Sequence, residues 1–283
     1  MKREILKQIK TFLIILTILT TFVFILIFKD KEKVGALGML MMWIPGISAI
    51  FTSLISKDKI GDYGWKPGKL KQLGWAYILP LIAALIAFGF VWISGLSDFT
   101  PEEVKNYRWA RYLGFDLPAP FLAGFLGKAV LSTFIAMLLT FGEEVGWTGF
   151  LTQKILKLKS VPVTSLIVGV LWSVWHFPAI IGGVYGWEAP LWIALPSFTI
   201  AFIGVSFIRT TLWSRSKSLW TGVLLHASHN IIFMSMFWEM TVKNEYTSYL
   251  VSETGIVSAI VYLAVGILFW KLLQKKNRKL NSN

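Results

Sequence analysis

Long apolar segments dominate this chain, and each is close to the length that an α-helix needs to cross a membrane. These segments lie at about 12–28, 34–56, 74–96, 121 to beyond 150, 161–181, 191–208, 218–238 and 255–270. A helix of about 20 apolar residues spans the hydrocarbon core of a bilayer. The sequence therefore predicts an all-α, polytopic membrane helix bundle of about eight transmembrane helices.

The composition excludes a soluble globular domain. Of the 283 residues, 55% are hydrophobic and only 15% are charged. That is more apolar surface than one water-soluble core can bury, so the bilayer must act as the solvent. The chain has no Cys, which removes disulfides, thiolate nucleophiles and Cys-based metal sites.

No linker or internal repeat divides the chain, so we predict a single transmembrane domain over residues 1–283. The first apolar segment is too long for the core of a secretory signal and lacks a small-residue cleavage site, so we expect a membrane helix there. Between the third and fourth spans, Thr100, Pro101 and the two Glu residues after them have the pattern of a helix start. They predict a short helix on the outer membrane surface through about Arg111.

The distribution of basic residues tests this topology independently. With both termini in the cytoplasm, the inner segments hold 20 of the 28 Lys and Arg residues, including Arg209, and the outer segments hold 7. Cytoplasmic loops are normally the basic ones. The net charge of +13 is therefore explained by topology and not by nucleic-acid binding, because it is divided among short loops. We expect a multi-pass protein of a prokaryotic cell membrane with cytoplasmic termini.

Ionisable side chains inside the predicted spans are the candidates for function. Of the 15 acidic residues, only Glu143 and Glu144 fall inside a span, and all three histidines, His176, His226 and His229, do so as well. A charged side chain at the centre of a bilayer costs roughly 2.5–3.5 kcal/mol. Because of this cost, a set of ionisable residues inside the spans is expected to have a function.

Helix geometry predicts which of these residues meet. Glu143 and His176 lie almost equally far from the turn that joins the fourth and fifth spans, about 25 Å along their helices, so they are level with each other. His226 and Asn230 are spaced i, i+4 and project from one face of the seventh span. His229 is rotated by about 60° from His226 and is expected to point at a neighbouring helix.

A carboxylate, two imidazoles and a carboxamide in one pocket suit hydrolysis. The carboxylate and one imidazole can take a proton from water, and the N–H groups can stabilise an oxyanion. Two His and one Glu could instead hold zinc with an open position for water. A proton-relay transporter is a further alternative, although it predicts inverted repeats that the sequence lacks. No cofactor is assigned at this stage.

Three segments resemble the CAAX prenyl protease and bacteriocin-processing (CPBP, or Abi) family of intramembrane endopeptidases. The segments are 143–150 (EEVGWTGF), 171–178 (LWSVWHFP) and 224–230 (LLHASHN). They are similar, in order, to that family's Glu-Glu-x-x-x-Arg, aromatic-x-x-x-His and His-x-x-x-Asn motifs. The motif region covers about 121–235, and the flanking helices match only in being hydrophobic.

The resemblance implies a metal-free, glutamate-dependent protease. In that reading Glu143 and His176 activate water, His226 and Asn230 form the oxyanion hole, and Glu144 supports the site. The expected partners are membrane lipids and a lipidated or membrane-associated protein substrate, which enters a pocket open to both the membrane and water. A non-enzymatic bacteriocin-immunity or scaffold protein of the same fold remains an alternative.

One residue departs from the family pattern. Thr148 stands where the family usually has Arg, which would lie i, i+4 from Glu144 and neutralise it. Glu144 must therefore find another partner or stay protonated. On this reading, Thr148→Arg is expected to be tolerated.

Overall fold

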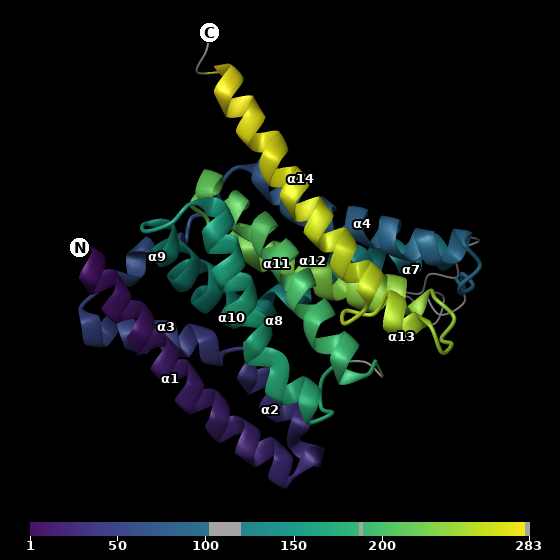
Figure 1. The fold of residues 1–283 in the computed structure, drawn as a ribbon, viewed down its shortest axis with the longest axis horizontal. Coiled ribbons are helices and arrows are strands. Elements are labelled where there is room, and N and C mark those ends of the chain that lie inside the picture. The colour runs from purple at the N-terminus through teal and green to yellow at the C-terminus, as the bar shows by residue number, and fades with distance from the viewer. Residues whose placement is uncertain (102–119, 187–188, 281–283) are drawn as a thin grey trace.

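A computed structural model describes residues 1–101, 120–186 and 189–280, and this part of the chain folds into helices (Figure 1). It contains no strand, and its one isolated β-bridge joins Phe99 to Thr241. The predicted all-α membrane bundle is confirmed. The surface helix predicted through Arg111 lies outside the described residues.

The first half of the bundle begins with a long helix and a bent pair. Its elements are α1 (Lys2–Lys29), η1 (Lys31–Lys33), α2 (Val34–Met41), α3 (Ile44–Ser56), η2 (Ile60–Tyr63) and α4 (Leu70–Ile93). The motif-bearing half follows. Its elements are α7 (Pro120–Gly127), η3 (Lys128–Ser132), α8 (Thr133–Glu144), η4 (Val145–Thr152), α9 (Gln153–Leu156), α10 (Val161–Ile181), α11 (Leu191–Ser216), α12 (Trp220–Ser228), η5 (His229–Phe237), α13 (Thr247–Leu250) and α14 (Ile256–Leu280).

Six helices among the described residues are long and apolar enough to cross a membrane. A seventh span results if Lys31–Met41 and Ile44–Ser56, which meet at a 46° bend, count as one. The predicted segment 218–238 forms α12 and η5. The count of eight spans stays a prediction.

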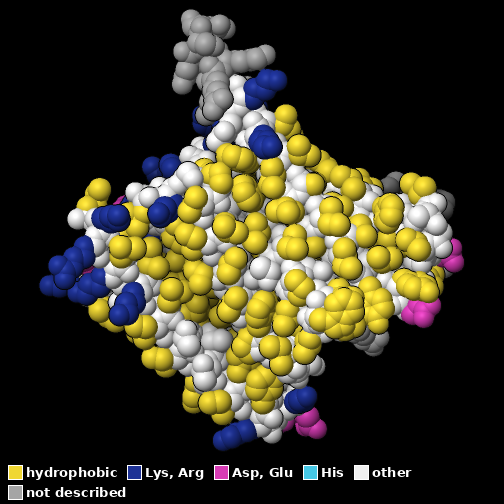
Figure 2. Space-filling model, in the orientation of Figure 1, with side chains coloured by type: hydrophobic (Ala, Val, Ile, Leu, Met, Phe, Trp, Pro, Cys, Tyr) yellow, Lys and Arg dark blue, Asp and Glu magenta, His cyan; other side chains and the backbone are white. Residues whose placement is uncertain are grey.

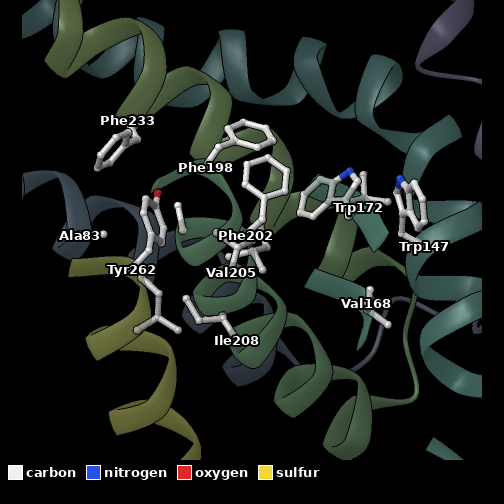
Figure 3. Packing of buried hydrophobic residues seen from close by; sticks show 14 of the residues in the cluster. Ala83, Trp147, Val168, Trp172, Phe198, Phe202, Val205, Ile208, Phe233 and Tyr262 are labelled. Atoms are coloured by element: carbon white, nitrogen blue, oxygen red, sulfur yellow. The ribbon is translucent and has the colours of Figure 1, made fainter. Parts of the chain in front are cut away.

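The centre of the bundle is α11, which packs against α10 and α14 (Figure 1). Phe198, Phe202, Val205 and Ile208 recur every three or four residues, so they share one face of the helix, and all are buried (Figure 3). The helix continues past the predicted end of its span at residue 208 to Ser216. Arg209 therefore lies inside a packed helix and not in a loop.

The helices that carry the first and third motifs change from α to π geometry within the motif. The π-helix η4 begins directly after Glu144, and η5 begins at His229, three residues after His226. A π-helical turn holds an extra residue, and such turns are frequent at functional sites.

Two glycines set the depth at which the Glu pair lies. A Cβ atom on Gly142 would stand 2.7 Å from the backbone oxygen of Met42, and one on Gly146 would stand 2.5 Å from that of Pro45. The backbones of α8 and η4 therefore touch the start of α3, as small residues four apart allow in membrane helices. Glu143 and Glu144 lie between these two contacts.

The outer surface has the character expected of a protein in lipid. Large apolar side chains are exposed along the helices, such as Ile18, Leu138 and Trp192, which are 61%, 70% and 77% exposed. Figure 2 shows hydrophobic side chains over most of the visible face, with Lys and Arg gathered along the edge that carries both chain ends.

Candidate active site

One cavity brings together the four residues predicted to be catalytic. Glu143, His176, His226 and Asn230 all line this space of about 280 Å³, which the helices enclose only in part. Its remaining wall is mostly apolar and includes Phe24, Ile27, Val34, Met41, Ala179 and Phe202.

Glu143 lies near the C-terminal end of α8 and is almost fully buried, with 3% of its surface exposed. Its Oε2 accepts a hydrogen bond of 3.0 Å from the indole Nε1 of Trp172 on α10. An indole N–H can only donate. The carboxylate therefore has a fixed orientation at the wall of the cavity.

The tautomer of His176 follows from its backbone contact. Its Nδ1 lies 2.9 Å from the carbonyl oxygen of Trp172. A carbonyl can only accept, so Nδ1 carries a proton, and neutral His176 holds its lone pair on Nε2. The ring meets the rings of Phe198 and Phe202 edge to face, at 5.3 and 5.4 Å between centroids. These contacts orient an imidazole that can act as a base.

Glu144 and His226 form a hydrogen-bonded pair between α8 and α12. Nδ1 of His226 lies 3.1 Å from Oε1 of Glu144, and Glu144 is fully buried. The carboxylate accepts from Nδ1, so Nε2 is the remaining ring nitrogen of His226, which lines the cavity.

Glu144 has a positively charged neighbour in place of the Arg of the family motif, and this residue comes from a different helix, α11. The second oxygen of Glu144, Oε2, accepts a hydrogen bond from the hydroxyl of Thr148 and lies 3.8 Å from Nε of Arg209 on α11. Arg209 is only 1% exposed. Its assignment to a cytoplasmic loop is therefore wrong, because α11 continues through it and buries it against Glu144.

Trp172 contacts each of the charged or titratable groups described so far except Glu144. It donates its indole N–H to Glu143 and its backbone carbonyl accepts from His176. Its ring meets the ring of His226 edge to face at 5.1 Å. The guanidinium carbon of Arg209 lies 3.9 Å from the centroid of the same ring. The sequence had identified this residue only as the aromatic member of a motif.

His229 points away from these residues, as the helical geometry predicted. Its Nδ1 lies 2.6 Å from the hydroxyl of Tyr262 on α14, and its Nε2 lies 3.0 Å from Oε1 of Glu253. The other oxygen of Glu253 accepts a 2.5 Å hydrogen bond from Tyr185. Burial and the neighbouring Glu253 raise the pKa of Tyr185 well above its usual range, so its hydroxyl stays protonated.

Glu253 and Tyr185 also line the cavity, and the sequence did not identify them. Glu253 is 3% exposed although it precedes the last apolar segment, and Tyr185 lies between α10 and α11. Neither residue belongs to a hydrophobic repeat, so the sequence pattern does not predict that it is buried. Glu253 is therefore a further buried acid, which lies before the last predicted span and not inside one.

The zinc alternative does not fit this arrangement. No three His, Cys, Asp or Glu side chains within the described ranges converge as metal ligands. A three-ligand zinc site would require these side chains to rearrange. What stands against zinc is the spacing of the side chains and not the bonds at Nδ1 of His176 and His226, because metal-binding histidines commonly make such bonds and bind through Nε2.

Comparison with known proteins agrees with the motifs. Residues 124–232 match the family model described as type II CAAX prenyl endopeptidase, Rce1-like. This range contains all three motifs. The chain is also similar to a protein of Methanococcus maripaludis named CAAX prenyl protease 2, with 27% identity over 209 residues that cover 68% of this chain and 71% of the relative.

Proposed function

We propose that this chain, a membrane protease that resembles the type II CAAX prenyl endopeptidases, hydrolyses a peptide bond within its central cavity, with Glu143 and His176 activating water. The observation that carries the proposal is the convergence of these two side chains with His226 and Asn230 on one buried cavity. Ionisable side chains are costly inside a membrane. The convergence of a carboxylate, two imidazoles and a carboxamide on one cavity therefore favours a functional role over a structural one.

The chemistry needs one base and one route for the proton. Glu143, oriented by the indole of Trp172, takes a proton from a water molecule, whose oxygen attacks the carbonyl carbon of the scissile bond. Nε2 of His176 can share or relay this proton. When the tetrahedral intermediate collapses, the proton passes to the leaving nitrogen, and the products are a carboxylic acid and an amine.

Two side chains can stabilise the oxyanion. Asn230 presents a carboxamide at the cavity, and its N–H can donate to a developing negative charge. Since Nδ1 of His226 is bonded to Glu144, Nε2 of His226 can donate only in the imidazolium form. Glu144 holds the imidazole from its Nδ1 side, which assigns Glu144 a supporting role.

The substrate is a membrane-associated protein that carries a lipid near its cleavage site. Its hydrocarbon chain could lie in a second apolar hollow, of about 460 Å³ between α1 and α10, which shares Phe24 and Trp175 with the catalytic cavity. The similar protein from Methanococcus maripaludis is named a CAAX prenyl protease, so a prenylated C-terminal segment is the first candidate. The cavity would then be open to the membrane as well as to water.

The orientation follows from charge. The start of α1 and the end of α14 lie on the edge of the molecule where most of the visible Lys and Arg gather (Figures 1 and 2). Positively charged segments remain in the cytoplasm, so both termini are proposed to be cytoplasmic in a prokaryotic cell membrane.

The test is cleavage of a defined peptide by purified protein in detergent or lipid. A peptide ending in a CAAX sequence is offered with and without a prenyl group on its Cys, and the products are identified by mass spectrometry. Cleavage of the prenylated peptide is expected. If a folded protein cuts neither peptide, a membrane scaffold or bacteriocin-immunity protein is the better description. Loss of cleavage with a chelator and its recovery with zinc would support the metal-dependent alternative.

A further inference from the structure

We propose that Arg209 is a positioning residue of the active site, which orients Glu143 through Trp172 and His226 through Glu144. The inference rests on the proposed function, because it assigns a role in the same reaction. Arg209 touches neither the proposed water nor the substrate, so its effect must pass through the two side chains that it contacts.

The burial of Arg209 calls for an explanation beyond packing. Arg209 follows the buried Ile208 on α11 and is itself only 1% exposed. Its Nη1 and Nη2 atoms have no hydrogen-bond partner within the described part of the chain. Burying a guanidinium costs several kcal/mol unless it is well paired. An apolar residue would fill this position more favourably if packing were its only role.

The first branch leads from Arg209 to the proposed base. The guanidinium lies over the face of Trp172, with its central carbon 3.9 Å from the ring centroid. A planar guanidinium stacks on an aromatic face and restricts the rotation of that ring. The indole N–H of Trp172 donates to Oε2 of Glu143 at 3.0 Å. Holding the ring plane therefore holds the carboxylate.

The second branch leads from Arg209 to the proposed oxyanion hole. Nε of Arg209 lies 3.8 Å from Oε2 of Glu144, and the other oxygen of Glu144 bonds to Nδ1 of His226 at 3.1 Å. Thr148 donates to the same Oε2 atom. The Glu144 carboxylate therefore lies between the guanidinium and the imidazole, and its bond to Nδ1 fixes His226 with Nε2 at the cavity.

Four variants test this role in the full-length protein, with kcat and KM measured on the cleaved peptide. Arg209→Gln removes the charge, Arg209→Lys keeps the charge but not the planar stack, and Trp172→Phe keeps the ring but not the N–H. Arg215→Gln is the matched control, because it removes the same charge from the same helix at a residue that bonds the Leu273 carbonyl.

The expected result is a loss in kcat with KM unchanged within about twofold. Arg209→Gln should lower kcat by about 10- to 100-fold, and Trp172→Phe by about 10-fold, the size expected for a lost hydrogen bond to a charged group. Arg209→Lys should fall between Arg209→Gln and the wild type, and Arg215→Gln should match the wild type. A residue needed only for folding would lower the amount of active protein without this order.

The outcomes separate this proposal from the proposed function. If Glu143→Gln is inactive while Arg209→Gln, Arg209→Lys and Trp172→Phe all match the wild type, the positioning role is wrong and the glutamate mechanism stands. If Glu143→Gln is fully active, the mechanism itself is wrong. If Arg209→Gln fails to fold, Trp172→Phe and Arg209→Lys decide the question, and wild-type kcat in both overturns the proposal.

Discussion

Nδ1 of His226 lies 3.1 Å from Oε1 of Glu144, so the first and third motifs of this chain are joined by a direct hydrogen bond. The two residues lie on α8 and α12, and each helix continues into a π-helical segment close to the pair. The bond fixes the orientation of the His226 ring. It also places a buried carboxylate between an imidazole and the guanidinium of Arg209.

Glu144→Ala is expected to lower stability as well as activity. The change leaves the Arg209 guanidinium buried without a counter-charge, and breaking a buried pair in this way typically costs about 3–5 kcal/mol. Thermal unfolding of the purified variant in detergent should show a clear fall in Tm relative to the wild type. An unchanged Tm would mean that Arg209 and Glu144 are not a stabilising pair.

Gly146→Ala is expected to destabilise the bundle because a Cβ there would stand 2.5 Å from the Pro45 backbone. The helix bearing the Glu pair would have to move away from α3, which should lower both Tm and activity. Gly89→Ala on α4 is the control, since nothing lies within 4 Å of its added Cβ. In a helix, Ala is favoured over Gly by roughly 0.5–1 kcal/mol. Equal Tm values for the two variants would contradict the close contact.

The structure changes the expectation for Thr148→Arg. Thr148 is fully buried, and its Oγ1 would stand 2.5 Å from a Cβ on Gly222 of α12, so little space remains for a longer side chain. Arg209 already supplies a positive charge to Glu144. A second buried guanidinium should lower Tm and activity, whereas Thr148→Ser, which keeps the hydroxyl, should stay close to the wild type. A fully active, stable Thr148→Arg protein would restore the original expectation.

The motif residues could be placed from sequence because each lies in a long apolar segment that the sequence predicts as a membrane span. Helix rise was sufficient to predict that Glu143 and His176 are level, and the helical wheel predicted that His229 turns away. Both residues of the first pair line one cavity, and His229 contacts Tyr262 on α14.

The contacts that support the site could not be predicted in this way. Arg209 follows the last strongly apolar residues of its span, where an Arg normally marks the membrane surface, and Glu144 is 65 positions earlier in the chain. Their ion pair depends on how α8 and α11 cross. Glu253 is likewise buried by tertiary packing and not by a local pattern. Hydrophobic periodicity reports on single helices and carries no information on such crossings.

Asn230→Ala should impair catalysis more than His229→Ala does. Loss of one oxyanion donor typically costs about 2.7–4 kcal/mol of transition-state stabilisation, or roughly 10²- to 10³-fold in rate. His229 bonds Glu253 and Tyr262 and contacts the site only indirectly, so its removal should mainly lower Tm. The ratio of kcat values for the two variants checks the assignment, and a larger kcat loss in His229→Ala would reverse it.

The most direct test of the account is the cleavage rate of Glu143→Ala and His176→Ala on a lipidated peptide, measured on protein shown to be folded. Both side chains line the same cavity, and removing a polar group from the membrane interior should not weaken helix insertion. The account predicts that neither variant cleaves the peptide, although each is inserted and unfolds at a temperature close to that of the wild type. Cleavage at the wild-type rate by folded Glu143→Ala protein would contradict it.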